Sequence, residues 1–139
     1  MLYKHENSTF EFRNVSGMEN YDLYIEQIEI ITKRNRRDLE YLLYKNKNSY
    51  AFAIFLKDSI VGFQGYVCKP FLVNGEVVPT FCSEFTIAIP ELRGTGIYPE
   101  FYKFTMNRIV EDYGKVYIWG ETGHRGFLNF GYKMYDTVS

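Results

Sequence analysis

A turn with two glycines, Gly94-Thr95-Gly96, is the part of this sequence best suited to binding a charged small molecule. It follows an apolar stretch with strand character and precedes a helical stretch in which Pro99 falls in the first turn, where its missing N–H group costs nothing. Glycine lets a backbone approach a ligand closely, and the first N–H groups of a helix have no internal acceptors. These donors and the positive end of the helix dipole would form an anion site, well suited to a pyrophosphate. A plain strand-to-helix turn explains the residues equally well, whereas a dinucleotide-binding fingerprint would need a third glycine.

Several other side chains carry reactive groups in contexts that do not mark them as catalytic. His124 falls in an expected loop, and Tyr132 and Tyr135 fall near the end of the sheet that the glycine turn occupies. We interpret each of these three as structural in preference to catalytic. Cys82 is conceivable as a nucleophile, but no neighbouring residue marks its thiol as activated. No metal-ligand spacing is present, so we expect no metal site.

The two cysteines flank the pair Asn74-Gly75, which is the strongest short signal for a β-hairpin. Simple pairing around that turn sets Cys68 opposite Phe81 and Val67 opposite Cys82. The two thiols would then lie on opposite faces of the sheet, where they cannot form a disulfide. A bulge would change this register, but free thiols in a reducing cytoplasm are the favoured interpretation.

The elements that must position these residues follow from the hydrophobic pattern, which indicates one domain, residues 1–139. The expected strands are residues 10–13, 50–56, 60–68, 81–89, 116–119 and 132–138. The expected helices are residues 19–33, 36–45 and 98–113, and residues 122–130 form a short helix or turn. The order β-α-α-β-β-β-α-β-α-β predicts an α+β fold with three layers, α/β/α, and a mixed central sheet of six to seven strands.

The composition is that of a globular protein with an aromatic core. Hydrophobic residues make up 46% and charged residues 24%, and the aromatic 19% includes 13 Tyr and 12 Phe. Aromatic side chains that stack on nucleic acid need a positive groove beside them. The net charge of −1 provides no such field, so we expect no nucleic-acid partner.

The chain carries no sequence signal for export or for a membrane span. The first seven residues are charged and lack an apolar core, so we expect no signal peptide and a frayed end around His5. The longest clean apolar run, residues 51–56, is far too short to cross a membrane. We therefore expect no membrane partner.

Positive charge gathers in the run Lys33-Arg34-Asn35-Arg36-Arg37, at the junction of the first two expected helices. A solvated helix end and turn is the simpler interpretation of this run. Contact with an anionic ligand is the other.

The glycine turn and its surroundings resemble a known family. The stretch Pro90-Glu91-Leu92-Arg93-Gly94-Thr95-Gly96-Ile97 resembles the acyl-CoA motif of the GNAT acetyltransferases, written Arg/Gln-x-x-Gly-x-Gly/Ala. The expected strand order is similar to the GNAT fold from the first strand to the sixth, and Phe130-Gly131-Tyr132-Lys133 resembles the family's closing Gly-Phe element. The motif has Tyr98 where Gly or Ala is usual, or Glu91 where Arg or Gln is usual, depending on the alignment. Either alignment keeps the two glycines.

The resemblance implies that acetyl-CoA or a related acyl-CoA binds between the splayed fourth and fifth expected strands. Its pyrophosphate would lie over the glycine turn, and backbone N–H groups of the fourth strand would polarise the thioester carbonyl. The residues implied in binding are Ile87, Ala88, Ile89, Arg93, Gly94, Thr95, Gly96, Ile97 and Tyr98.

Glu84 is the residue to which the resemblance assigns the role of general base. Members of the family often carry a base upstream of the glycine turn, and strand alternation would place Glu84 on one face with Thr86 and Ala88. A surface glutamate at a strand end is the other interpretation. The general acid is left open, because Phe127 occupies the position of the tyrosine that often serves as the acid.

The resemblance thus implies a cytoplasmic acyltransferase that moves an acetyl or short acyl group to an amine or hydroxyl of a small molecule, such as a sugar or metabolite. The reaction would proceed by direct attack, with the acceptor against the first two helices and the 71–79 hairpin. The seventh strand of typical members has no counterpart before Ser139, which would leave an unpaired sheet edge and favours a homodimer, or a partner strand added from elsewhere. Two other interpretations stay open: a non-catalytic acyl-CoA-binding module, favoured by Phe127, and an interaction protein that kept only the fold.

Overall fold

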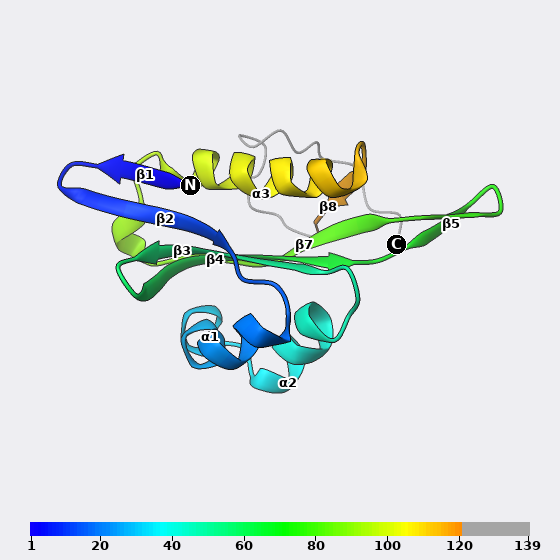
Figure 1. The fold of residues 1–139 in the computed structure, drawn as a ribbon, viewed down its shortest axis with the longest axis horizontal. Helices are drawn as coiled ribbons and strands as arrows, with labels where there is room; N and C mark the ends of the chain where they lie inside the picture. Colours follow the sequence, from blue (N-terminus) through cyan, green and yellow to red (C-terminus); the bar gives the residue numbers. More distant parts are fainter. Residues whose placement is uncertain (121–139) are drawn as a thin grey trace.

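A computed structural model describes residues 1–120, which form a six-stranded sheet with helices on both faces and a small two-stranded sheet (Figure 1). The strands are β1 (Leu2–His5), β2 (Ser8–Asn14), β3 (Tyr50–Leu56), β4 (Ser59–Cys68), β5 (Phe71–Val73), β6 (Glu76–Val78), β7 (Thr80–Ala88) and β8 (Tyr117–Trp119). The helices are α1 (Met18–Thr32), α2 (Arg36–Leu39), the π-helix η1 (Glu40–Tyr44), the 3₁₀-helix η2 (Pro90–Leu92) and α3 (Ile97–Tyr113). The elements expected at residues 122–130 and 132–138 lie outside the described residues.

The large sheet has the strand order β1-β2-β3-β4-β7-β8, and only the β7–β8 pair is parallel within the described residues. Helices α1 and α2 cover one face of the sheet and α3 covers the other (Figure 1). We call these the α1–α2 face and the α3 face. The predicted three-layer α+β fold with a mixed sheet is therefore confirmed.

The first residues form a strand, so the expectation of a frayed end around His5 is wrong. Strand β1 pairs with β2 through a tight turn, and the rings of Tyr3 and Phe12 stack with their centroids 6.2 Å apart. The pairing with β2 and this ring contact hold β1 in place, although the residues of β1 show little apolar alternation of their own. The strand expected at residues 10–13 is correspondingly longer and begins at Ser8.

The helix expected at residues 36–45 is divided into two geometries. Asn35 caps α2, because its side chain accepts a hydrogen bond from the Asp38 N–H at 2.9 Å. From Glu40 the chain continues as a π-helix, closed by the Lys45 N–H bonding to the Glu40 carbonyl at 2.7 Å. No residue type marks such a widened turn in a sequence, so the apolar pattern indicated only one helix.

The hairpin predicted at Asn74-Gly75 is present, with φ values of 50° and 81° at the two turn residues. It forms a separate two-stranded sheet, β5 with β6, that extends away from the body of the protein between β4 and β7 (Figure 1). Below it, Cys68 pairs with Phe81 and Val67 with Cys82, as the sequence predicts. Neither cysteine forms a disulfide within residues 1–120, which confirms that they do not bond to each other.

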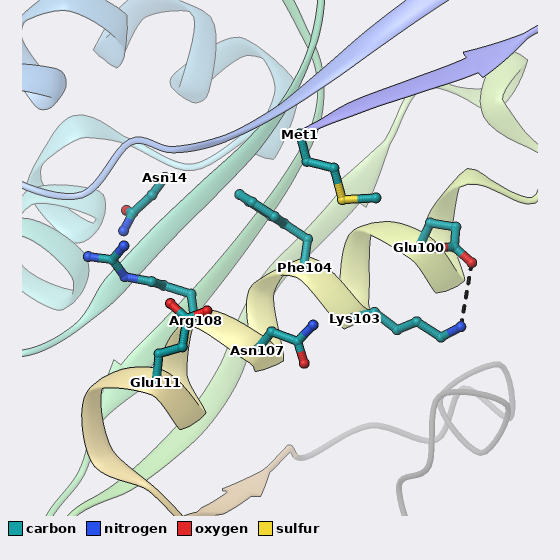
Figure 2. A pocket seen from close by; sticks show the side chains of 8 residues that line it. All are labelled: Met1, Asn14, Glu100, Lys103, Phe104, Asn107, Arg108 and Glu111. Carbon is teal, nitrogen blue, oxygen red and sulfur yellow. Dashed lines mark ion pairs between the residues drawn. The ribbon is translucent and has the colours of Figure 1, made fainter.

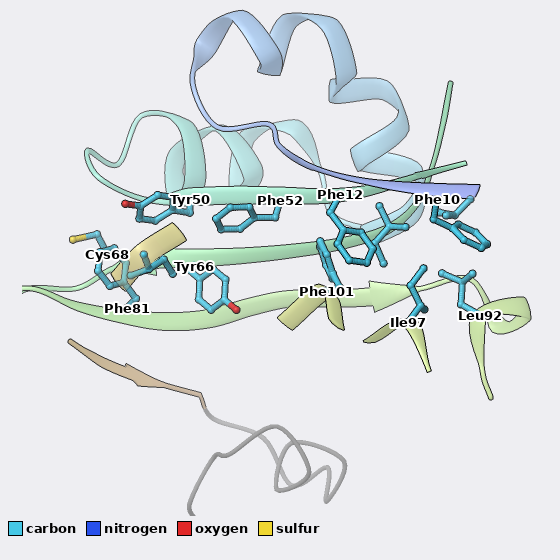
Figure 3. Packing of buried hydrophobic residues seen from close by; sticks show 13 residues of the cluster. Phe10, Phe12, Tyr50, Phe52, Tyr66, Cys68, Phe81, Leu92, Ile97 and Phe101 are labelled. Carbon is cyan, nitrogen blue, oxygen red and sulfur yellow. The ribbon is translucent and has the colours of Figure 1, made fainter. Parts of the chain in front are cut away.

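Two hydrophobic clusters hold the layers together, one on each face of the sheet. On the α3 face, aromatic side chains of β2, β3, β4 and β7 pack against Phe101 of α3 (Figure 3). On the α1–α2 face, Ile25 and Ile28 of α1 pack with Leu43 of η1 onto the sheet. Alternate residues of each central strand enter one cluster or the other, which explains why β3 and β4 read as nearly continuous apolar runs.

Candidate active site

The site begins where β7 and β8 separate. The two strands pair only from Thr80 to Cys82 on β7, against Tyr117 to Trp119 on β8. Beyond Cys82, no strand of residues 1–120 pairs with this edge of β7. The side chains change at the same point, from buried at residues 80–82 to half-buried at residues 83–88. The sheet is therefore splayed along the second half of β7, at the place where the resemblance expects an acyl-CoA.

A β-bulge interrupts β7 within this open segment. Gly65 pairs with Glu84 and Phe63 with Ile87, so Phe85 and Thr86 together lie opposite the single residue Gln64. Phe85 takes a φ of 60°, which is strained for an aromatic residue. Strain of this kind, held in place by its surroundings, is common at functional sites.

The bulge overturns the expectation that Glu84 shares a face with Thr86 and Ala88. Phe85 packs with the cluster of the α1–α2 face, whereas Ala88 packs with that of the α3 face. Glu84 lies on the α1–α2 face, since its partner Gly65 faces Leu43 there. The extra residue shifts the alternation by one position, and a sequence pattern alone does not reveal such an insertion.

A buried polar network holds the bulge on the α3 face. Gln64 is fully buried, and its Oε1 accepts hydrogen bonds from the hydroxyls of Thr86 at 2.5 Å and Tyr102 at 2.9 Å. Its Nε2 donates to the Gly65 carbonyl at 2.6 Å and to the Glu84 carbonyl at 3.4 Å. Because buried polar groups are costly when unpaired, this network favours one position of the bulge relative to α3.

Backbone donors on the open edge differ in their availability. The N–H of Ile89 donates to the Val61 carbonyl at 3.0 Å, so it is engaged within the sheet. In an antiparallel pair the next residue along points its N–H the other way, and Ala88, opposite Gly62, therefore directs its N–H to the open edge. Ile87, Ala88 and Ile89 were expected to polarise the thioester carbonyl with their N–H groups. Of these, Ala88 has the N–H group best directed to do so.

The glycine turn lies between η2 and α3, and within residues 1–120 it leaves some of its N–H groups without an acceptor. Gly94 and Gly96 have φ values of 77° and 74°. The N–H groups of Gly94, Gly96 and Tyr98 have no hydrogen-bond acceptor within residues 1–120. Among residues 1–120, a side chain at Gly94 would meet no atom within 4 Å, so the described part of the chain leaves open space beside the turn. Such a turn fits a phosphate that accepts several backbone hydrogen bonds.

Two tyrosines fix the turn against the rest of the protein. The Tyr3 hydroxyl of β1 donates to the Thr95 carbonyl at 2.7 Å. The Tyr98 hydroxyl donates to the Ile87 carbonyl at 2.5 Å, which ties the start of α3 to the open strand. Burial raises the pKa of Tyr98, so this hydroxyl stays protonated and can donate. The large residue that departs from the usual motif therefore points toward β7.

Glu84 is held at the point where the strands separate. Its Oε1 lies 3.7 Å from the Lys69 Nζ and accepts a hydrogen bond from the Cys82 thiol at 3.7 Å. The Lys69 ammonium also lies 5.2 Å from the centre of the Trp119 ring. Trp119 in turn stacks on Phe71 of the hairpin, with ring centroids 6.1 Å apart. Glu84 is partly exposed and oriented, which a proton acceptor requires.

The fold brings residues to the site from distant segments that the sequence did not indicate, namely Tyr3, Gln64, Lys69 and Tyr102. Of these, only Gln64 carried a signal, because it is the polar side chain inside the apolar run of β4. The role of Tyr3 depends on β1, which was not predicted. The candidates Phe127, His124, Tyr132 and Tyr135 lie outside the described residues.

Other features of the described residues do not join this site. A pocket of 340 Å³ follows the outer side of α3 near the N-terminus and contains none of the predicted site residues (Figure 2). It is lined by Met1, Asn14, Glu100, Lys103, Phe104, Asn107, Arg108 and Glu111. Residues 1–120 contain no group of His, Cys, Asp and Glu side chains that could hold a metal ion. Among them, no helix is long and apolar enough to cross a membrane.

Comparison with known proteins identifies the fold. No protein-family profile and no curated protein sequence matches the chain. Solved structures do match: AAC(6')-Iy, in complex with the bisubstrate analog CoA-S-monomethyl-acetylneamine, is 15% identical with a TM-score of 0.68 over 94% of this chain and 95% of that chain. Glucosamine-6-phosphate N-acetyltransferase from Arabidopsis thaliana is 11% identical with a TM-score of 0.66 over 94% of this chain and 95% of that chain.

The chain has the GNAT fold. A probable N-acyltransferase from Enterococcus faecalis V583 shares it at 14% identity and a TM-score of 0.66, over 88% of this chain. This chain spans only 31% of that protein. At these low sequence identities, the solved structures show a shared fold. They confirm the GNAT fold that the sequence resemblance implied.

Proposed function

We propose that this chain is an acyltransferase that uses acetyl-CoA, or another short acyl-CoA, to modify an amine or hydroxyl of a small molecule. One observation carries the proposal: the open edge of β7 leads, through η2, into a glycine turn in which the N–H groups of Gly94, Gly96 and Tyr98 have no acceptor within residues 1–120. In the GNAT fold, AAC(6')-Iy is the neighbour that holds a CoA-containing bisubstrate analog. The Arabidopsis neighbour is an N-acetyltransferase.

The residues of this chain suit the two ends of an acyl-CoA. In the turn from Arg93 to Tyr98, the N–H groups of Gly94, Gly96 and Tyr98 would hold the pyrophosphate, and the open space beside Gly94 leaves room for it. When bound, acyl-CoA supplies a thioester carbonyl that an acceptor can attack. The N–H of Ala88, with Ile87 and Ile89 on either side, would donate to the oxygen of that carbonyl.

Glu84 would take the proton of the attacking amine or hydroxyl. It lies on the α1–α2 face, so we place the acceptor between the α1–α2 segment and the β5–β6 hairpin. Lys69 and the Cys82 thiol hold the Glu84 carboxylate at the separation of β7 and β8. A carboxylate oriented in this way needs no rearrangement before it accepts a proton.

A non-catalytic acyl-CoA-binding module is the second candidate, favoured by Phe127 at the position of the usual acid. Calorimetry with CoA and turnover of acetyl-CoA with a panel of amines and sugars separate the candidates. We expect saturable CoA binding and acetyl transfer. Binding without transfer would support the binding module, and a folded protein that gives no heat at millimolar CoA would exclude both.

We also propose a homodimer in a reducing compartment such as the cytoplasm. Apolar side chains of the β5–β6 hairpin are exposed, with Leu72 at 74% and Val77 at 72%, and neither cysteine forms a disulfide within residues 1–120. Sedimentation velocity at high protein concentration checks the dimer, and a clean monomer would contradict it.

A further inference from the structure

The β7 bulge turns an aromatic ring toward the basic turn between α1 and α2. Phe85 packs on the α1–α2 face, directly after Glu84 in the chain. The guanidinium carbon of Arg34 lies 5.5 Å from the centre of the Phe85 ring, a distance at which a cation and an aromatic face attract each other. The basic run noted in the sequence therefore touches the candidate active site through Arg34.

Local hydrogen bonds hold the backbone of Arg34 on both sides. The Thr32 hydroxyl donates to the Ile28 carbonyl at 2.6 Å and accepts from the Arg34 N–H at 3.3 Å. Lys33 ends α1 in a left-handed conformation, and Asn35 caps α2 immediately afterwards. The turn thus presents Arg34 from a fixed backbone, although its side chain is exposed.

The charge of Arg34 is not compensated by any carboxylate among residues 1–120. Its near neighbour Arg36 is fully used, with Glu29 at 2.7 Å and Glu26 at 3.7 Å, whereas Arg34 makes no ion pair within these residues. The Glu84 carboxylate nearby already has Lys69 as its partner. Arg34 therefore brings to the α1–α2 side of the site a positive charge that has no ion-pair partner within residues 1–120.

We propose that Arg34 binds an oxyanion, a carboxylate or a phosphate, on the acceptor, so that the preferred acceptor is an anionic amine or alcohol. A guanidinium presents several N–H donors in one plane, which match the two oxygens of a carboxylate or phosphate. The cation–π contact with Phe85 holds the guanidinium near the site, and no carboxylate of residues 1–120 pairs with it. This inference rests on the proposed acyl transfer and names the acceptor class for it.

The test compares four amines with the same two-carbon spacer: ethanolamine, β-alanine, O-phosphoethanolamine and ethylenediamine. With acetyl-CoA, we expect kcat/KM for β-alanine or O-phosphoethanolamine to exceed that for ethanolamine at least about 10-fold, as one charge-assisted contact provides. Arg34→Gln should lower the value for the anionic amine about 10–100-fold and leave that for ethanolamine unchanged. The better of the two anionic amines identifies the oxyanion.

Two further variants make the result specific. Arg34→Lys keeps the charge but loses the planar donors, so it should recover only part of the preference. Arg37→Gln removes an equal charge three residues away, in a residue that lines a separate pocket beside α2, and should change nothing. A preference for ethylenediamine, or equal losses in Arg34→Gln and Arg37→Gln, would overturn the inference.

Binding measurements keep the inference distinct from the proposed function. If no amine of the set is acetylated, inorganic phosphate and acetate are titrated by calorimetry into CoA-saturated protein. Saturable anion binding that Arg34→Gln removes would support the inference, and its absence would overturn it. If the protein binds CoA and acetylates all four amines equally, the acyltransferase proposal stands but the anionic acceptor class is wrong. If the protein does not bind CoA, the acyltransferase proposal and the acceptor class both fail.

Discussion

Replacing Gly94 with valine is expected to raise the dissociation constant for CoA about 100-fold, as the loss of one or two charge-assisted hydrogen bonds would. Gly94 has a φ of 77°, and a Cβ atom there would project into space that no atom of residues 1–120 fills within 4 Å. A valine would therefore meet the bound pyrophosphate before it met any residue of the described chain. It would also disfavour the left-handed backbone that directs the N–H groups.

Gly75→Val is a matched control for the backbone strain that a valine causes at a positive φ value. Gly75 has a φ of 81°, a Cβ atom there would also meet nothing within 4 Å, and it lies in the β5–β6 turn. Gly75→Val should lose a comparable amount of stability, about 1–2 kcal/mol, without a change in CoA affinity. Gly96 is a less informative target, because a Cβ atom there would come within 3.2 Å of the Tyr3 hydroxyl.

Isothermal calorimetry of the three proteins with CoA, together with urea unfolding, checks this expectation. Equal CoA affinity in the Gly94 and wild-type proteins would mean that the turn is only a connection between β7 and α3. The acyl-CoA would then have to bind elsewhere, and the proposed function would lose the observation that carries it.

Replacing Glu84 with glutamine is expected to lower the rate of acyl transfer about 10²–10⁴-fold, the usual contribution of a general base. Glutamine keeps the size of the side chain but cannot accept the proton of the acceptor. The affinity for CoA should stay the same, because Glu84 lies on the α1–α2 face, away from the glycine turn. Binding and orientation of both substrates would still leave a residual rate.

The pH dependence separates a base from a merely structural glutamate. The wild-type kcat/KM should show one ionisation that is missing in Glu84→Gln. Glu111→Gln, which removes an exposed carboxylate on α3, should retain both the rate and the pH profile. An unchanged rate and profile in Glu84→Gln would place the base elsewhere, or would mean that the acceptor arrives deprotonated. The CoA site would be unaffected by that result.

Local patterns in the sequence were enough to predict the layers and most of the elements. The alternating and helical periods placed α1, β3, β4, β7 and α3 within one or two residues of their observed bounds. The Asn74-Gly75 pair located the hairpin and, with it, the register that keeps Cys68 and Cys82 apart. These features depend on the apolar face of a single element or on a single turn. Each of these is determined by residues that are close together in the sequence.

The candidate site was only partly predictable, because its parts depend on different ranges of the sequence. The glycine turn is local: positive φ values at Gly94 and Gly96 and the helix that follows belong to one short segment. The position of Glu84 is not local, since a single inserted residue in β7 reverses the face of everything after it. That insertion is stabilised from outside the strand, by Gln64 of β4 and Tyr102 of α3.

By itself, the sequence determined the fold class, the hairpin, the unbonded cysteines and a glycine turn suited to an anion. Only the tertiary structure decided that the chain begins with a paired strand, that β7 is open beyond Cys82, and that Glu84 faces α1 and α2. Only it brought Lys69 to Glu84 and Arg34 to Phe85. The physical reason is that periodicity and turn chemistry act between near neighbours, whereas a bulge, a strand separation and a cation over a ring depend on contacts between segments far apart in the chain.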